Sequence, residues 1–309
     1  MINIVKREIE KAWANSAPLT FTAVLMLASF FASVGGMLID NRIITGVPAW
    51  LKPAKFAISS GIYAGTIAWL YQYVTVWPSF RRAMGWVIAL VLVLEVGIID
   101  LQAARGTTSH FNAATPLDAA LFGVMGTAIV VLWLASIGVV AALFRQQFSD
   151  RTWGWALRLG LLISVLGAGA GGFMLGPKSG QLATMPPKVI GGHTVGAPDG
   201  GPGLPGVGWS TEHGDLRIPH FFGLHAVQVL PLLVMVMRRR RVASAFAAAG
   251  SYLGFIGILT WQAMRGQSIV QPDAITLTAL AIWAVLSVIV IVACGFRSSR
   301  DSVRFAAIA

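Results

Sequence analysis

Charged residues are scarce in this sequence: Asp, Glu, Lys and Arg together make up only 11% of its 309 residues. A typical soluble domain carries about 25% of these residues. The 56% of residues that are hydrophobic are also more than one soluble core of this length could bury. The scarcity of charge therefore excludes a soluble globular protein and indicates that a lipid bilayer surrounds most of the chain.

Cysteine and the common catalytic motifs are also missing. The single cysteine, Cys294, excludes an intrachain disulfide. Without Walker A, His-Glu-x-x-His or Cys-x-x-Cys patterns, nothing indicates an ATPase, a zincin or a thiol-redox enzyme. The absence of a Gly-x-Ser-x-Gly nucleophile elbow disfavours a serine hydrolase.

What the sequence does contain is a series of apolar segments. Each is about 20 residues long, the length that an α-helix needs to cross the hydrocarbon core of a bilayer. The segments are 18–39, 54–76, 84–104, 117–143, 157–176, 218–237, 244–263 and 274–296. They predict an all-α polytopic membrane protein with about eight transmembrane helices, whose main partner is the lipid bilayer.

The formal net charge of +11 could suggest a nucleic-acid partner, but the basic residues are distributed as in a membrane protein. In the eight-helix arrangement, 15 of the 23 Lys and Arg residues fall on the side that holds both termini. The positive-inside rule makes that side the cytoplasm. We therefore expect an inner-membrane protein with cytoplasmic N- and C-termini and no nucleic-acid partner. The 15 residues are Lys6, Arg7, Lys11, Arg81, Arg82, Arg145, Arg151, Arg158, Arg238 to Arg241, Arg297, Arg300 and Arg304.

A short pattern occurs twice. Residues 102–106 and 262–266 both read Gln-Ala-x-Arg-Gly at the end of a predicted helix, and a proline with an Asp-Ala pair opens the next helix in each case. The repetition predicts a duplicated four-helix unit, in which residues 1–148 and 149–309 form two halves related by a parallel repeat about the membrane normal. The alternative is a chance similarity between two short sequence motifs.

The segment 177–217 is the long loop of the predicted topology, and it is dense in glycine and proline. Such a composition does not form a helix or a packed sheet by itself. Loops of this length are typically functional lids or disordered segments. All five histidines fall on the same outer side as this loop. The loop itself contains polar and aromatic side chains, so we expect a lid folded over the outer mouth of the bundle rather than a solvated tether. These side chains are His193, Asp199, Trp209, His213, Asp215 and Arg217.

Three residues are candidates for catalysis. Glu95 lies near the centre of the third predicted helix, where an acidic residue is costly to insert, so it must face protein or water. We expect it to be hydrogen-bonded in the bundle as a proton-binding or catalytic carboxyl, a counter-ion to a buried base, or a protonated packing residue. His220 and His225 are its candidate partners. Their spacing of five disfavours joint chelation of one metal ion on a helix, so no metal is assigned.

Other residues are candidates for ligand binding. Lys52 and Lys55 are three residues apart, so a helix would present both ammonium groups on one face, where they could hold a carboxylate or a phosphate headgroup. The alternatives are snorkelling beside interfacial tryptophans and neutralisation of Glu95 or Asp40. The remaining candidates lie near the outer ends of predicted helices: Gln102, Arg105, His110, Gln228, Gln262 and Arg265.

Two four-helix halves with outward histidines resemble the architecture of haem A synthase and related membrane haem proteins. The resemblance implies haem as a candidate cofactor. That family places histidines inside several helices of both halves, whereas the second, fourth and eighth predicted helices contain none here. A paired-histidine haem site in each half is therefore not supported.

Three functional interpretations follow from these residues. The leading one is an outward-facing polar cavity that binds a small or amphiphilic molecule, such as a lipid, in a transport or carrier-like role. The second is a membrane-embedded enzyme, either a haem or metal oxidoreductase or a hydrolase, that uses Glu95 with His220 or His225. The third is a structural or assembly subunit of a membrane complex, and homo-oligomerisation is not assigned.

Overall fold

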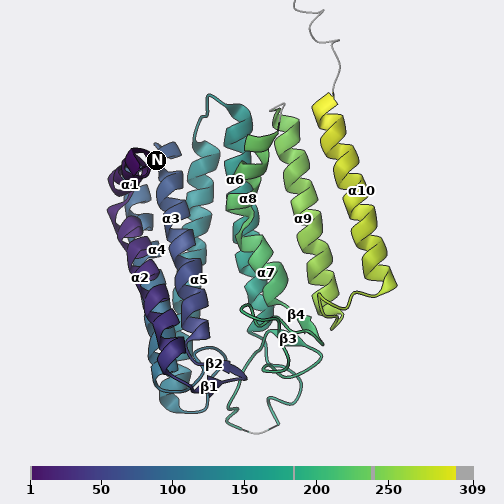
Figure 1. Cartoon of the computed structure of the whole chain (residues 1–309). Helices are drawn as coiled ribbons and strands as arrows, with labels where there is room; N and C mark the ends of the chain where they lie inside the picture. Colours follow the sequence, from purple (N-terminus) through teal and green to yellow (C-terminus); the bar gives the residue numbers. More distant parts are fainter. Residues whose placement is uncertain (1, 184, 238–240, 297–309) are drawn as a thin grey trace, which may run out of the picture.

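The computed structural model describes residues 2–183, 185–237 and 241–296 (Figure 1). Arg238 to Arg240, Arg297, Arg300 and Arg304, all predicted to be cytoplasmic, lie outside this described part. The helices are α1 (Ile2–Asn15), α2 (Ala17–Ile39), α3 (Leu51–Leu70), α4 (Pro78–Ala104), α5 (Pro116–Arg145), α6 (Arg151–Ala170), α7 (Arg217–Leu224), α8 (Ala226–Val236), α9 (Val242–Met264) and α10 (Ala274–Phe296). Short 3-10 turns follow α3 (Tyr71–Tyr73) and α6 (Gly171–Met174).

The strands of the described part form two small antiparallel pairs. β1 (Ile43–Ile44) pairs with β2 (Val47–Pro48) between α2 and α3. β3 (Thr194–Val195) pairs with β4 (Gly214–Asp215), so both strands of this hairpin belong to the long loop.

Six of the described helices are long and apolar enough to cross a membrane: α2, α4, α5, α6 with its 3-10 extension, α9 and α10. A seventh span results if α7 and α8 are counted as one broken span. These helices confirm an all-α, multi-pass membrane protein in contact with lipid. The predicted number of eight transmembrane helices is not confirmed. The reason is that α3, which corresponds to the predicted segment 54–76, is not among the helices that are long and apolar enough to span a membrane.

The outward faces of these helices are apolar. Phe31 on α2 is 64% exposed, Leu134 on α5 is 55% exposed and Val285 on α10 is 59% exposed. Large apolar side chains at this exposure would be costly in water, whereas hydrocarbon solvates them at no cost. The exposed surface of the bundle therefore agrees with a lipid environment.

The sixth predicted helix, 218–237, is broken in the structure. α7 and α8 meet at His225 with a bend of 51°. α7 also crosses α6 with almost no space between the backbones, since a Cβ atom added to Gly167 would lie 2.4 Å from Cα of Gly223. Small residues at such a crossing let two membrane helices approach closely.

The helices of the two predicted halves pack in the same order. α2 packs against α3 and α4, and α6 packs against α7, α8 and α9, while α5 packs against both α4 and α6. α1 and the C-terminal end of α10 lie at one end of the bundle (Figure 1). We call this the basic end, because Arg81, Arg145 and Arg158 belong to it. The opposite end carries the long loop, and we call it the lid end.

Candidate functional site at the lid end

The described part of the long loop, which we call the lid, contacts connections from both predicted halves of the bundle. On one side it pairs with the connection between α4 and α5, where the amide of Ala113 donates to Lys188 O (2.8 Å) and the amide of Ile190 donates to Phe111 O (3.0 Å). On the other side it is held by the connection between α9 and α10. There, the hydroxyl of Ser268 donates to Ser210 O (2.9 Å).

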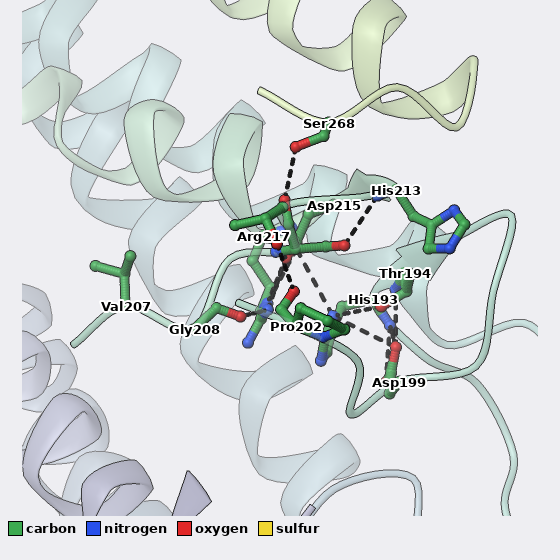
Figure 2. A network of polar contacts seen from close by, with 12 residues as sticks. His193, Thr194, Asp199, Pro202, Val207, Gly208, His213, Asp215, Arg217 and Ser268 are labelled. Carbon is green, nitrogen blue, oxygen red and sulfur yellow. Dashed lines mark hydrogen bonds and ion pairs between the residues drawn. The ribbon is translucent and has the colours of Figure 1, made fainter. Parts of the chain in front are cut away.

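Two carboxylates, the partly exposed Asp199 and the buried Asp215, organise the lid (Figure 2). Asp199 accepts hydrogen bonds from the backbone amides of His193 (3.1 Å) and Thr194 (2.8 Å). Asp215, on β4, accepts one from the amide of Ser210 (3.0 Å) and forms an ion pair with Arg217 (2.6 Å). Because these acceptors satisfy backbone amides that the loop's short strands leave unpaired, a glycine-rich segment adopts a defined fold.

Three cations converge beneath the lid, and we call Lys52, Lys55 and Arg217 the cationic cluster. The first turn of α3 supplies both lysines and the first residue of α7 supplies the arginine. The ammonium group of Lys55 donates to Val207 O (3.0 Å), and the guanidinium group of Arg217 donates to the next carbonyl, that of Gly208. The charges of all three are near enough to interact with one another.

Within the described part of the chain, the lysines of the cationic cluster form no direct ion pair. Arg217 is neutralised by Asp215, but neither Lys52 nor Lys55 has a carboxylate oxygen within 4.0 Å among the described residues. The described contact of the Lys52 ammonium is with the ring of Phe56, 5.9 Å from its centroid. Both lysines are half-buried. The two lysines therefore present positive charge without a direct ion pair beside an apolar ring, with Asp199 and Asp215 acting on them only at longer range.

The neighbouring histidines are neutral at physiological pH. Burial, reinforced by the positive charge of Arg217, lowers the pKa of His193 to about 4 against the opposing effect of Asp199 and Asp215. Burial, with a smaller contribution from the charge of Lys52, also lowers the pKa of His110 well below its usual value. His110 lies 5.2 Å from the ring of Phe56. Both imidazoles can therefore accept or donate a hydrogen bond without adding charge to the cluster.

The two Gln-Ala-x-Arg-Gly segments adopt the same local structure. The side-chain amide of Gln102 donates to Thr108 O (3.4 Å), and that of Gln262 donates to Ser268 O (2.8 Å), six residues further on in both cases. The glycines that close the helices are both left-handed: Gly106 (φ +77°) and Gly266 (φ +73°). Each glutamine thus fixes the loop that follows its helix.

The arginines of the two segments also have equivalent partners. Arg105 forms an ion pair with Asp118 (2.7 Å), and Arg265 forms one with Asp273. Each aspartate lies at the start of the next helix, where a carboxylate is favoured. Gln102, Arg105, Gln262 and Arg265 therefore connect consecutive helices, and no described contact brings them into the cationic cluster. The shared geometry supports a duplicated unit, which stays a prediction for the halves as a whole.

The three candidate catalytic residues do not converge. Glu95 is 3% exposed and faces the bundle as expected, but its Oε1 atom has no hydrogen-bond partner in the described structure, contrary to the expected hydrogen bond. Nδ1 of His220 lies 2.7 Å from Gly167 O on α6. The ring of His225 packs 4.4 Å from that of Phe221. Nothing in the described part brings an imidazole to the Glu95 carboxyl.

Gln228, the other intrahelical candidate, connects α8 to α3. Its side-chain amide donates to the hydroxyl of Thr66 (3.0 Å), while its Oε1 atom is buried without a partner. Within the described residues, no group of three or more His, Cys, Asp or Glu side chains is arranged to hold a metal ion. The cavity next to Asp215 and Gln262 is large enough for about one water molecule.

Sequence reasoning placed Lys52, Lys55 and His110 among the binding residues. It noted His193, Asp199, Asp215 and Arg217 only as polar residues of the lid and did not include them in the site. An available signal was the pair Asp215-x-Arg217, an acid and a base two residues apart at the end of a glycine-rich loop. Comparison of the whole chain with known protein families, curated proteins and solved structures finds no match. The site must therefore be interpreted from its own chemistry.

Proposed function

We propose that this multi-pass membrane protein binds the anionic group of a small or amphiphilic molecule at the cationic cluster, in a carrier-like role. The observation that carries the proposal is the pair of half-buried lysines, Lys52 and Lys55, without carboxylate partners beneath an ordered lid. Ammonium groups removed from water without a counter-ion are costly, and a bound carboxylate or phosphate would offset that cost. The ring of Phe56 would contact the apolar part of the same molecule.

The membrane orientation belongs to the same proposal. We infer that the basic end faces the cytoplasm and the lid faces the opposite side of an inner membrane, because 15 of the 23 basic residues follow the positive-inside pattern. A reporter inserted at Gly201 should be extracytoplasmic, and one fused to the C-terminus should be cytoplasmic. Either reporter on the other side would contradict the orientation.

The binding proposal is tested with octyl phosphate on protein purified in a neutral detergent. Octyl phosphate should bind, whereas octylamine should not. In a Lys52→Gln/Lys55→Gln variant the affinity for octyl phosphate should fall by about tenfold or more, since a hydrogen bond to a charged group contributes about 1.5–3 kcal/mol. Lys188→Gln is the matched control, because Lys188 is an exposed lysine of the same lid.

Equal binding of octyl phosphate and octylamine, or an unchanged affinity in the double variant, would contradict an anion site at the lysines. A chain that binds neither probe but co-purifies with a stoichiometric partner would instead support a structural or assembly subunit.

The unpartnered carboxyl of Glu95 favours a second candidate, a membrane-embedded enzyme. A buried acid without a hydrogen-bond partner is typical of sites where a proton is held for transfer. A visible absorption spectrum of the purified protein tests the haem form of this candidate, since bound haem gives a Soret band. With no such band, loss of a measured activity in Glu95→Gln would still support the enzyme.

A further inference from the structure

The basic end of the bundle contains a second candidate site, separate from the cationic cluster. An open depression of about 530 Å³ lies between the turn that precedes α4 and the C-terminal end of α5. Its lining combines apolar, aromatic and cationic side chains: Val76, Trp77, Phe144, Arg145 and Gln147. We call it the arginine pocket.

The walls of the arginine pocket are fixed by hydrogen bonds between its two elements. The side-chain carbonyl of Gln146 accepts hydrogen bonds from the amides of Thr75 (2.8 Å) and Val76 (3.3 Å), which fastens the turn before α4 to the end of α5. Trp77 has a left-handed backbone (φ +51°), which is unfavourable for a bulky residue. Its ring packs edge-on against Phe80 at 6.0 Å. The turn therefore holds the indole of Trp77 in the pocket wall.

The positive charge of the arginine pocket is not compensated. Within the described residues, neither Arg145 nor Arg158 has a carboxylate oxygen within 4.0 Å. Arg158 does not line the pocket: it donates to Leu143 O (2.9 Å) and to Gln146 O, and its guanidinium lies 5.0 Å from the ring centroid of Phe148. Arg145 is therefore the cation of the pocket lining. The nearby Asp150 is engaged as the N-cap of α6.

We propose that the arginine pocket binds the phosphate headgroup of an anionic phospholipid from the leaflet at the basic end. A basic pocket between transmembrane helices is the feature that recognises such headgroups. Trp77 supplies the amphipathic ring that favours the membrane interface. The Arg145 guanidinium binds the phosphate, and Val76 and Phe144 contact the glycerol and the first part of the acyl chains. The site requires only that the bundle is in a membrane and is independent of ligand binding beneath the lid.

Native mass spectrometry of the full chain in a neutral detergent tests this site with three probes: phosphatidylglycerol, phosphatidylcholine and inorganic phosphate. The wild-type chain should retain phosphatidylglycerol in preference to phosphatidylcholine. Arg145→Gln should weaken phosphatidylglycerol binding by about fivefold, the factor that corresponds to one basic residue near an anionic lipid surface. Arg145→Lys keeps the charge and should retain most of the preference.

Arg151→Gln is the matched control, because Arg151 is an exposed arginine at the same end that does not line the pocket. Equal retention of the two lipids by the wild-type chain, or equal losses in Arg145→Gln and Arg151→Gln, would overturn the proposal. Complete displacement of phosphatidylglycerol by millimolar inorganic phosphate would overturn the lipid assignment and indicate a site for the free anion.

Discussion

The crossing of α6 and α7 is a contact at which the effect of a single substitution can be predicted from the structure. At Gly167, a Cβ atom would lie 2.4 Å from Cα and 2.6 Å from the carbonyl carbon of Gly223. These obstacles are backbone atoms, so no side chain can rotate away to relieve the overlap. Gly167→Ala must therefore move one helix away from the other.

The magnitude follows from two opposing effects. Overpacking a tight contact costs about 1–3 kcal/mol, and a contact between two backbones belongs at the upper end of that range. Replacing a helical glycine by alanine returns about 1 kcal/mol through helix propensity. Gly167→Ala should thus destabilise the protein by about 2 kcal/mol. The displacement would also strain the contact of 2.7 Å between His220 Nδ1 and Gly167 O.

Thermal unfolding in detergent, followed by the intrinsic fluorescence of the tryptophans, measures this effect. Gly97→Ala is the matched control, since Gly97 is also helical but has no atom within 4 Å of its added Cβ. We expect a clearly lower melting temperature for Gly167→Ala and an unchanged or higher one for Gly97→Ala. A Gly167→Ala protein as stable as the Gly97→Ala protein would refute the backbone crossing and the positioning of α7 that depends on it.

Three further predictions concern the lid, the helix connections and the buried acid. The pKa of His193 is lowered from 6.5 to about 4 in the folded lid. Between these two pH values His193 is protonated in an opened lid but neutral in the folded one, so a falling pH favours opening. After correction for the intrinsic rate, hydrogen exchange of residues 193–216 should therefore accelerate as the pH falls from about 6.5 towards 4. His193→Gln should flatten this pH dependence, and the same profile in both proteins would contradict the role of His193. Arg105→Gln should destabilise the protein more than Arg265→Gln, because it leaves a buried carboxylate unpaired: the side chain of Asp118 is 5% exposed and that of Asp273 is 38% exposed. Thermal melts of the two variants measure the difference, and the reverse order of stability would contradict the prediction. Glu95→Gln should unfold at the wild-type temperature at pH 7, because no hydrogen bond to its Oε1 atom is lost; a large destabilisation would reveal a partner for the carboxyl.

Parts of the candidate site were predictable from the sequence. Lys52 and Lys55 were identified because their spacing places them in one helical turn, and α3 does begin at Leu51. Their partner Arg217 follows 162 positions after Lys55, and no local pattern connects residues so far apart. The expectation that Glu95 would be hydrogen-bonded failed for its Oε1 atom, because the cost of inserting an acid predicts burial but not which neighbour lies beside it.

The sequence by itself determined the all-α class and the approximate bounds of most membrane helices, but not their number, because a run of apolar residues must be helical in hydrocarbon whatever surrounds it. It also determined the connections after Gln102 and Gln262, whose hydrogen bonds join residues six positions apart. Only the tertiary structure decided the break at His225, the fold of the lid around Asp199 and Asp215, and the convergence of cations beneath it. The physical reason is the range of the interactions: helix formation depends on neighbours within a turn, whereas these features depend on which distant helices pack together.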